Sequence, residues 1–258
     1  MTTIHPTAIV GSKAKLGNNI NVGPYAVIED DVEIGNDCSI GLHAGIYNGA
    51  RLGNNVKVFQ SASVSNLPQD LKYAGEQTYL YIGDNTIVRE FAALHKGTTA
   101  TGKTVIGKNC LLMAYTHVAH DCIVGDNVIL ANGVQVAGHV HIEDTVIIGG
   151  LSAIHQFGRV GKHAMVGGGA MAAADIPPYC LTSGYPARYL GVNLIGLKRR
   201  NFSPEDIETI KDAYRIFFNS GLLYSDALKK LKEKYSEHNL IKGIIEFIES
   251  SERGIIRK

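Results

Sequence analysis

An aliphatic residue recurs at every sixth position along most of this chain, and this period restricts the possible folds more than any other feature. Counted from Ile4 in steps of six, only Asp70, Glu76 and Ala100 interrupt the series up to Val166. The position two residues before each aliphatic one is mostly small or β-branched. Residues two apart on a strand share a face, so each hexapeptide predicts a short strand with a large and a small inward side chain. A helix would need apolar spacings of three and four, which this period cannot supply.

Short parallel strands joined by tight turns stack into a β-helix, in which each coil buries its aliphatic row against its neighbours. The pattern resembles that of the hexapeptide-repeat transferases. That resemblance implies a left-handed coil of three hexapeptides, with 18 residues per turn of a triangular prism. We therefore expect a mainly β fold: a left-handed parallel β-helix over residues 1–190, followed by a small α-helical domain over 191–258.

Two stretches leave the pattern without shifting its frame. Residues 65–81 and 95–104 are rich in polar residues and glycine, and the first also contains a proline. They are predicted to be loops extruded from an intact coil. Long loops on a rigid scaffold are commonly functional, which favours a functional role for the first loop. For the second loop, a functional role and a tolerated insertion are equally compatible with the sequence.

The period changes near residue 191, where helical signals begin. Ser203 is a predicted N-cap, Pro204 occupies the first helical position, and Gly221 follows the predicted end. Apolar residues between them follow helical spacing. Two further amphipathic helices are expected near residues 225–236 and 239–251.

Composition excludes several classes of protein. The 258 residues are 45% hydrophobic and 19% charged, which describes a globular chain with ample core. No apolar run approaches the roughly 18 residues that span a bilayer, and the start lacks a secretory pattern. We therefore expect a cytoplasmic protein without an integral membrane segment. A net charge of +1 argues against a general nucleic-acid binder, and four cysteines without a CxxC pair indicate neither a disulfide framework nor a zinc ribbon.

The segment AYTHVAHDCIVGDNVILAN, residues 114–132, concentrates reactive side chains. Cys122 falls in the small inward register, which predicts a core residue rather than a nucleophile. No histidine of the repeat region occupies either inward register, so His117 and His120 are expected to face outward. His120 with the adjacent Asp121 could supply a general base near neutral pH.

With 18 residues per coil, His120, Gly138 and Gln156 fall in one column at a spacing of roughly 4.8 Å. His139 and His155 adjoin members of that column. The backbone N–H of Gly138 could stabilise the oxyanion of a tetrahedral intermediate. A base and an oxyanion donor without an activated nucleophile favour direct acyl transfer to a substrate hydroxyl or amine.

Longer motifs make a more specific resemblance. IHPTAIV, QDLKYAGE, HVAHDCIVGDNVILAN, VAGHV, IGGLSAIHQFGRVG and GVNLIGLKRRNFS together resemble the UDP-N-acetylglucosamine O-acyltransferases along the full chain. The resemblance implies transfer of an R-3-hydroxyacyl group from acyl carrier protein to the glucosamine 3-hydroxyl. It also implies a cytoplasmic homotrimer with active sites between subunits. No resident cofactor is expected, because phosphopantetheine arrives on the carrier protein.

The same resemblance implies roles for individual residues. His120 would be the general base, Asp121 its orienting partner and Gly138 the oxyanion donor. Contacts to the sugar or to the acyl phosphopantetheine are implied for Lys72, His117, His139, His155 and Gln156. Asn193 and Arg199 would hold the nucleotide, a role that suits the forked guanidinium.

Two positions bear on specificity. Some members of that family carry an acidic residue where this sequence has Ile195, which leaves that nucleotide contact open. The position of Gly168 sets acyl length in the family, and a glycine there predicts an open groove, although Met165 and Met171 flank it. The acyl length, the choice between a 3-hydroxyl and a 3-amino acceptor, and the docking surface for the carrier protein stay open.

Three alternatives compete with this interpretation. An N-acyltransferase of the same pathway is the nearest, although the QDLKYAGE loop and the helical-domain sequence favour O-acylation. A zinc hydratase of the γ-carbonic anhydrase type would use histidines such as His117 and His120 as ligands, with bound zinc as its distinguishing property. A non-catalytic scaffold would show no turnover with any acyl donor.

Overall fold

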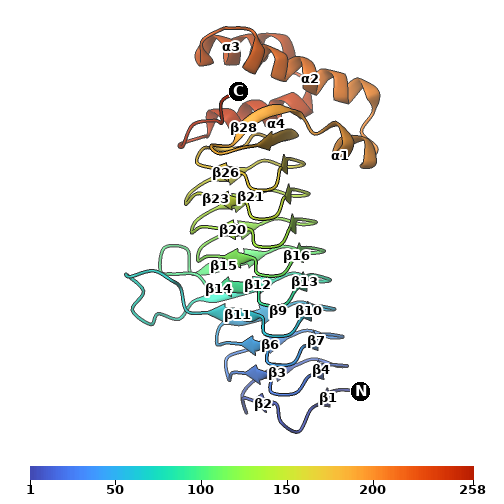
Figure 1. The fold of residues 1–258 in the computed structure, drawn as a ribbon, viewed down its shortest axis with the longest axis vertical. Coiled ribbons are helices and arrows are strands. Elements are labelled where there is room, and N and C mark those ends of the chain that lie inside the picture. The colour runs from blue at the N-terminus through green and yellow to red at the C-terminus, as the bar shows by residue number, and fades with distance from the viewer.

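Short strands wind into a tall three-sided column with helices stacked on its C-terminal end (Figure 1). This computed structural model describes residues 1–258. The chain forms a left-handed parallel β-helix, as the hexapeptide pattern predicted. Neighbouring coils pair in parallel with an 18-residue register, so that His117 lies opposite Gln135 and Ala153 opposite Met171.

The three walls are three sheets. The first sheet contains β1 (Thr3–Ile4), β4 (Asn21–Val22), β7 (Ser39–Ile40), β10 (Lys57–Val58), β13 (Ile87–Val88), β16 (Leu111–Leu112), β19 (Ile129–Leu130), β22 (Ile147–Ile148), β25 (Met165–Val166), β27 (Cys180–Ser183) and β28 (Arg188–Val192). The second sheet contains β2 (Ile9–Val10), β5 (Val27–Ile28), β8 (Gly45–Ile46), β11 (Ser63–Asn66), β14 (Ala93–His95), β17 (His117–Val118), β20 (Gln135–Val136), β23 (Ala153–Ile154) and β26 (Met171–Ala172). The third sheet contains β3 (Lys15–Leu16), β6 (Glu33–Ile34), β9 (Ala50–Leu52), β12 (Tyr79–Ile82), β15 (Lys103–Ile106), β18 (Ile123–Val124), β21 (His141–Ile142) and β24 (Arg159–Val160).

Both inward registers are buried in the interior of the column. Ile28 and Leu130 represent the large register and Ala26 and Cys122 the small one, and all four are inaccessible to solvent. Burial of one large aliphatic side chain stabilises the fold by roughly 1.5–3 kcal/mol. Repetition of this pair at every strand makes the column a rigid support for the side chains on its corners.

Two loops leave the column at the corner between the second and third sheets, where Figure 1 shows them projecting to one side. Ser63 pairs with Ala93, 30 residues on, and Ala93 pairs with His117, 24 residues on, so the loops are inserted into otherwise regular coils. The first loop spans residues 67–78 and the second residues 96–102. Both are shorter than their predicted ranges because strand pairing continues into the polar segments that flank them.

The last strands and the helices close the end of the column. β28 runs antiparallel to β27, a reversal that the hexapeptide pattern did not predict, and Pro178 stands where the aliphatic register would continue. The helices are α1 (Leu194–Arg199), α2 (Pro204–Asn219), α3 (Tyr224–Tyr235) and α4 (Asn239–Glu249). Ser203 caps α2 by accepting from the backbone N–H of Asp206 at 3.0 Å, as expected, whereas α1 was not foreseen. None of the helices is both long enough and apolar enough for a bilayer crossing.

Candidate active site

The corner between the second and third sheets, from here on the loop edge, carries the two loops together with Asp121, His139 and Phe157. Each of these three residues has a positive φ of 60° to 63°. A left-handed backbone at a tight corner costs a residue other than glycine roughly 1–2 kcal/mol. Adjacent coils offset this cost by stacking the corner side chains, as in the parallel rings of His139 and Phe157 at 4.6 Å.

His120 and Asp121 form a dyad at this edge. The Nδ1 atom of His120 lies 2.8 Å from Oδ2 of Asp121. An ionised carboxylate can only accept hydrogen bonds, so Nδ1 carries the proton and Nε2 presents a lone pair. That tautomer is the one that a general base requires.

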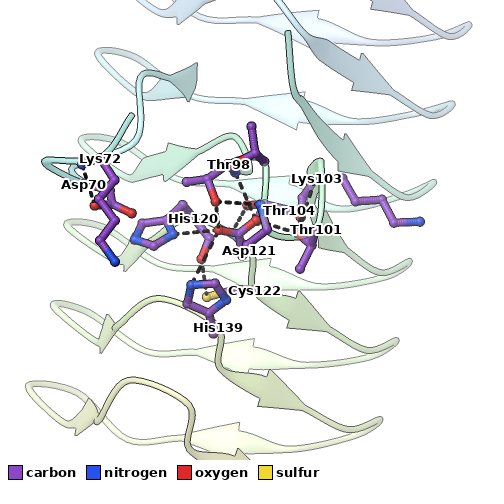
Figure 2. Close-up of polar contacts among 12 residues, drawn as sticks. Asp70, Lys72, Thr98, Thr101, Lys103, Thr104, His120, Asp121, Cys122 and His139 are labelled. Carbon is purple, nitrogen blue, oxygen red and sulfur yellow. Dashed lines mark hydrogen bonds and ion pairs between the residues drawn. The ribbon is translucent and has the colours of Figure 1, made fainter. Parts of the chain in front are cut away.

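The second loop surrounds the Asp121 carboxylate with hydrogen-bond donors. Thr98 donates to it through its backbone N–H at 2.9 Å and its hydroxyl at 2.7 Å, and the Thr101 hydroxyl donates at 2.5 Å. Figure 2 shows Asp121 between these threonines and His120. Burial raises the pKa of Asp121, but the hydrogen bonds from Thr101, His120 and Thr98 outweigh burial and lower the pKa to about 2. Asp121 is therefore a permanent anion at neutral pH.

The dyad lies outside the column but is not open to solvent. His120 is 7% exposed and Asp121 4% exposed. The expectation that His120 faces solvent was therefore wrong, because the second loop, through Thr98 and Thr101, covers the corner on which the dyad lies. A shielded site strengthens the attraction between the imidazole and the carboxylate.

Gly138 lies one coil along from His120, as the 18-residue column predicted. A Cβ at Gly138 would stand 2.8 Å from Cε1 and 2.9 Å from Nε2 of His120, so only a hydrogen fits between the backbone and the ring. Gly138 belongs to no strand, and its N–H donates to no group of the chain. A free N–H beside the basic nitrogen is a suitable donor to a developing oxyanion.

Other histidines crowd around the dyad. The ring of His139 meets that of His120 edge-on at 5.1 Å, and the ring of His117 lies 5.0 Å from that of His95. Burial, together with the nearby His95 and His120, lowers the pKa of His117 to about 4, so His117 is neutral at pH 7. His95 donates or accepts at Leu67 O at 2.6 Å and anchors the first loop.

Cys122 takes no part in this chemistry. Its side chain is inaccessible to solvent and points into the column, and burial raises the pKa of its thiol to about 12. A thiol that stays protonated is a poor nucleophile. The structure therefore supports the prediction that Cys122 is a core residue.

A groove of about 690 Å³ runs along the outer face of the second sheet, from His117 towards the β27–β28 turn. His155 and Gln156 line it with small residues such as Ala153, and Met171 and Tyr185 lie at its far part. Gly168 lies on the neighbouring corner and is absent from the lining. A long apolar chain would fit this groove, and its polar end would lie near the dyad.

Several predicted residues do not converge on the dyad within one chain. Lys72 is exposed on the first loop, and Arg199 and Ile195 are exposed on α1. Asn193 caps α1 by accepting from the Gly196 N–H and donates to His163 O, so both ends of its amide already have partners. His163 lies at the corner before the first sheet, not at the loop edge. Figure 1 shows α1 on the opposite side of the column from the loops.

His120, Asp121 and His139 are also the one group of side chains close enough to share a metal ion, with ligand atoms within 4.8 Å of one another. The carboxylate, however, already accepts from Thr98 twice, from Thr101 and from His120. Four hydrogen bonds use the lone pairs of both oxygens. The donor set therefore fits a hydrogen-bonded dyad better than a metal ion.

Comparison with known proteins identifies the family. A model of the second domain of UDP-N-acetylglucosamine O-acyltransferases matches residues 175–256, and a bacterial hexapeptide-transferase model matches residues 103–138. The acyl-carrier-protein-dependent UDP-N-acetylglucosamine O-acyltransferase of Aliarcobacter butzleri is 50% identical over 99% of this chain and 98% of its own length. The corresponding protein of Janthinobacterium is 51% identical over the full length of both chains. The chain belongs to the UDP-N-acetylglucosamine O-acyltransferase family.

Solved structures of this acyltransferase family share the fold throughout. The enzyme from Bacteroides fragilis superposes with a TM-score of 0.97 at 43% identity, over 99% of this chain and all of that one. LpxA from Acinetobacter baumannii gives a TM-score of 0.95 at 42% identity, over 98% of this chain and 99% of that one. The helices are thus part of the shared architecture, because the matched region includes them.

The sequence alone missed the partners of Asp121 in this acyltransferase. Thr98, Thr101 and Thr104 come from the second loop, and Thr104 accepts from the Asp121 backbone N–H at 2.8 Å. The available signal was the run TTATGKT, which places several hydroxyl groups in a short loop. Without the fold, nothing in that run points to a carboxylate 17 to 23 residues further along.

Proposed function

We propose that this acyltransferase moves an R-3-hydroxyacyl group from acyl carrier protein to the glucosamine 3-position of UDP-N-acetylglucosamine, with His120 as general base. The arrangement of His120 between Asp121 and Gly138 carries the proposal. The relatives in the comparison are named for this acceptor and donor, and the first of them matches over nearly all of both chains. O-acylation is preferred to N-acylation because those names specify it.

The reaction begins with proton transfer from the acceptor. Nε2 of His120 removes the proton of the sugar 3-hydroxyl as its oxygen attacks the thioester carbonyl. The carboxylate of Asp121 stabilises the imidazolium that forms. The oxyanion of the tetrahedral intermediate accepts from the N–H of Gly138, which has no other partner.

Collapse of the intermediate completes the transfer. The C–S bond breaks, and the phosphopantetheine thiolate leaves with the carrier protein. The His120 imidazolium returns its proton to that thiolate, which restores the neutral base. No covalent intermediate on the protein is required, in keeping with the buried, protonated thiol of Cys122.

The site would be completed by a second subunit. Asn193 and Arg199 lie at a different corner from His120 and nearer the helical end of the column. If they bind the nucleotide, that nucleotide must lie against the loop edge of a neighbouring chain. This separation supports a homotrimer with active sites between subunits. Gly168 as a determinant of acyl length, and a cytoplasmic location, also remain proposals.

Replacement of His120 by alanine tests the proposal. Purified wild-type protein and the His120→Ala variant would be assayed with a panel of R-3-hydroxyacyl carrier proteins and with both the 3-hydroxyl and the 3-amino nucleotide sugars, by mass spectrometry of the product. We expect loss of transfer at unchanged oligomeric mass. Retention of more than a few per cent of the wild-type rate would remove His120 as the base, and transfer only to the amine would reassign the acceptor.

A further inference from the structure

We propose that Thr98 and Thr101 are positioning residues that clamp the Asp121 carboxylate and thereby fix the orientation of His120. The inference rests on the proposed role of His120 as the base. Neither threonine needs to touch the substrate, since both act through Asp121. The second loop is then part of the catalytic apparatus rather than a tolerated insertion.

The clamp uses the full accepting capacity of the carboxylate. Oδ1 accepts from the Thr98 N–H and the Thr101 hydroxyl, while Oδ2 accepts from the Thr98 hydroxyl and from His120. The Asp121 side chain has no exposed surface. No water is therefore available to replace a lost donor, and each bond constrains the rotation of the carboxylate plane.

The loop that provides these donors is itself held in place. The Gly97 N–H donates to Tyr79 O at 3.1 Å, and the Gly102 N–H donates to Thr98 O at 2.7 Å. The Thr98 hydroxyl also accepts from the Ala100 N–H at 3.2 Å, which orients its own proton towards Asp121. A Cβ at Gly97 would lie 2.3 Å from the Lys103 backbone nitrogen, so the loop closes tightly against the next strand.

The backbone of Asp121 is restrained at the same point. Its N–H donates to Thr104 Oγ1, and its φ of 60° places it at the turn of the corner. Asp121 is thus held by hydroxyl groups on both main chain and side chain. Since His120 precedes it directly, a rotation of the carboxylate would remove the acceptor that keeps the His120 proton on Nδ1 and the lone pair on Nε2.

Thr98→Val and Thr101→Val, singly and combined, test the clamp. Valine keeps the shape of threonine and the Thr98 N–H but removes the hydroxyl. We expect kcat to fall about tenfold for each single variant and more for the pair, since one hydrogen bond to a charged group contributes on that order. KM for the nucleotide sugar should change by less than about twofold, because neither hydroxyl faces the acceptor. Thr98→Ser should recover most of the rate.

Thr99→Val is the matched control. Thr99 is an exposed neighbour in the same loop whose hydroxyl has no partner, so this variant should behave as wild type. Nitrogen-15 spectra of histidine-labelled protein supply a second readout. In the wild type the His120 signals should report a proton on Nδ1, and in the double valine variant they should shift towards a mixture of tautomers.

The outcomes separate this inference from the proposed function. If His120→Ala is inactive while the double valine variant keeps the wild-type kcat and histidine spectrum, the clamp is refuted and the base assignment stands. If His120→Ala remains active, the base assignment itself fails. A fall in rate for the valine variants without any change in the His120 tautomer, or equal loss in Thr99→Val, would show general loosening of the loop and would also refute the clamp.

Discussion

Gly138→Ala is the substitution that the geometry of the site makes most informative. It adds one methyl group where the backbone faces the His120 ring. The new Cβ would lie 2.8 Å from Cε1 and 2.9 Å from Nε2. Gly138 is not among the glycines with a positive φ, so alanine suits its backbone and the conflict is with the ring alone.

The size of the effect follows from these contacts. Carbon atoms pack at roughly 3.5–4.0 Å, so the ring must retreat by about 1 Å. Asp121 holds Nδ1 at 2.8 Å and His139 packs edge-on against the ring, so retreat breaks or strains the dyad. A misplacement of about 1 Å is able to reduce a rate by about 100-fold. Obstruction of the oxyanion donor adds to this, and we expect kcat to fall by about 10² to 10³.

Steady-state transfer with an acyl carrier protein and UDP-N-acetylglucosamine would measure the effect, with thermal unfolding in parallel. The matched control is Gly243→Ala, in the middle of α4, where the nearest atom to a new Cβ is Lys162 Nζ at 3.8 Å. This control should keep the wild-type kcat and gain about 0.4–1 kcal/mol of unfolding free energy.

The reasoning would be refuted by a Gly138→Ala enzyme with a kcat within about threefold of wild type. That result would show that the ring moves without loss and that the Gly138 N–H is not needed. An equal drop in melting temperature and rate would also count against it, because the argument predicts a folded protein with a displaced base.

Further predictions concern the dyad, pH and metal dependence. Asp121→Asn replaces an acceptor-only group by an amide that must turn a donor towards the threonines or His120; kcat should fall by about 10³ to 10⁴, as for a base in the wrong tautomer, and wild-type turnover would remove Asp121 from the mechanism. Burial lowers the pKa of both His163 and His117 to about 4, against about 6.5 in the unfolded chain, so the unfolded state takes up protons first and stability should decline as pH falls from about 6.5 to 4. In urea titrations at pH 7 and pH 5, His163→Phe should lose less stability than wild type, since Phe157 occupies an equivalent corner; an equal loss would show that His163 does not contribute. Dialysis against a chelator should leave transfer unchanged, and activity restored only by zinc would favour the metal alternative.

The hexapeptide period was enough to predict the column. An aliphatic residue at every sixth position, preceded two residues earlier by a small one, is compatible with an inward-facing strand pair and with little else. The same register separated Cys122 from His120, because one falls on the inward face and the other does not. The 18-residue coil then placed Gly138 beside His120, a pairing that the structure bears out to within van der Waals contact.

Other features depended on contacts between segments that no local pattern links. The second loop reads as a polar insertion, yet its threonines bury and saturate Asp121. Asn193 reads as a ligand, yet its amide already caps α1 and bonds to His163 O. The β27–β28 reversal and α1 lie where the six-residue period has ended.

By itself, the sequence determined which side chains form the wall and which lie outside it, because burial of an aliphatic row obeys a strict period. Only the tertiary structure decided how the outside residues work together. His120 becomes a shielded base because a loop inserted one coil earlier folds back over its corner and supplies the hydroxyl groups that keep Asp121 charged. Hydrogen bonds of this kind require a specific approach of two distant segments, which periodicity does not encode.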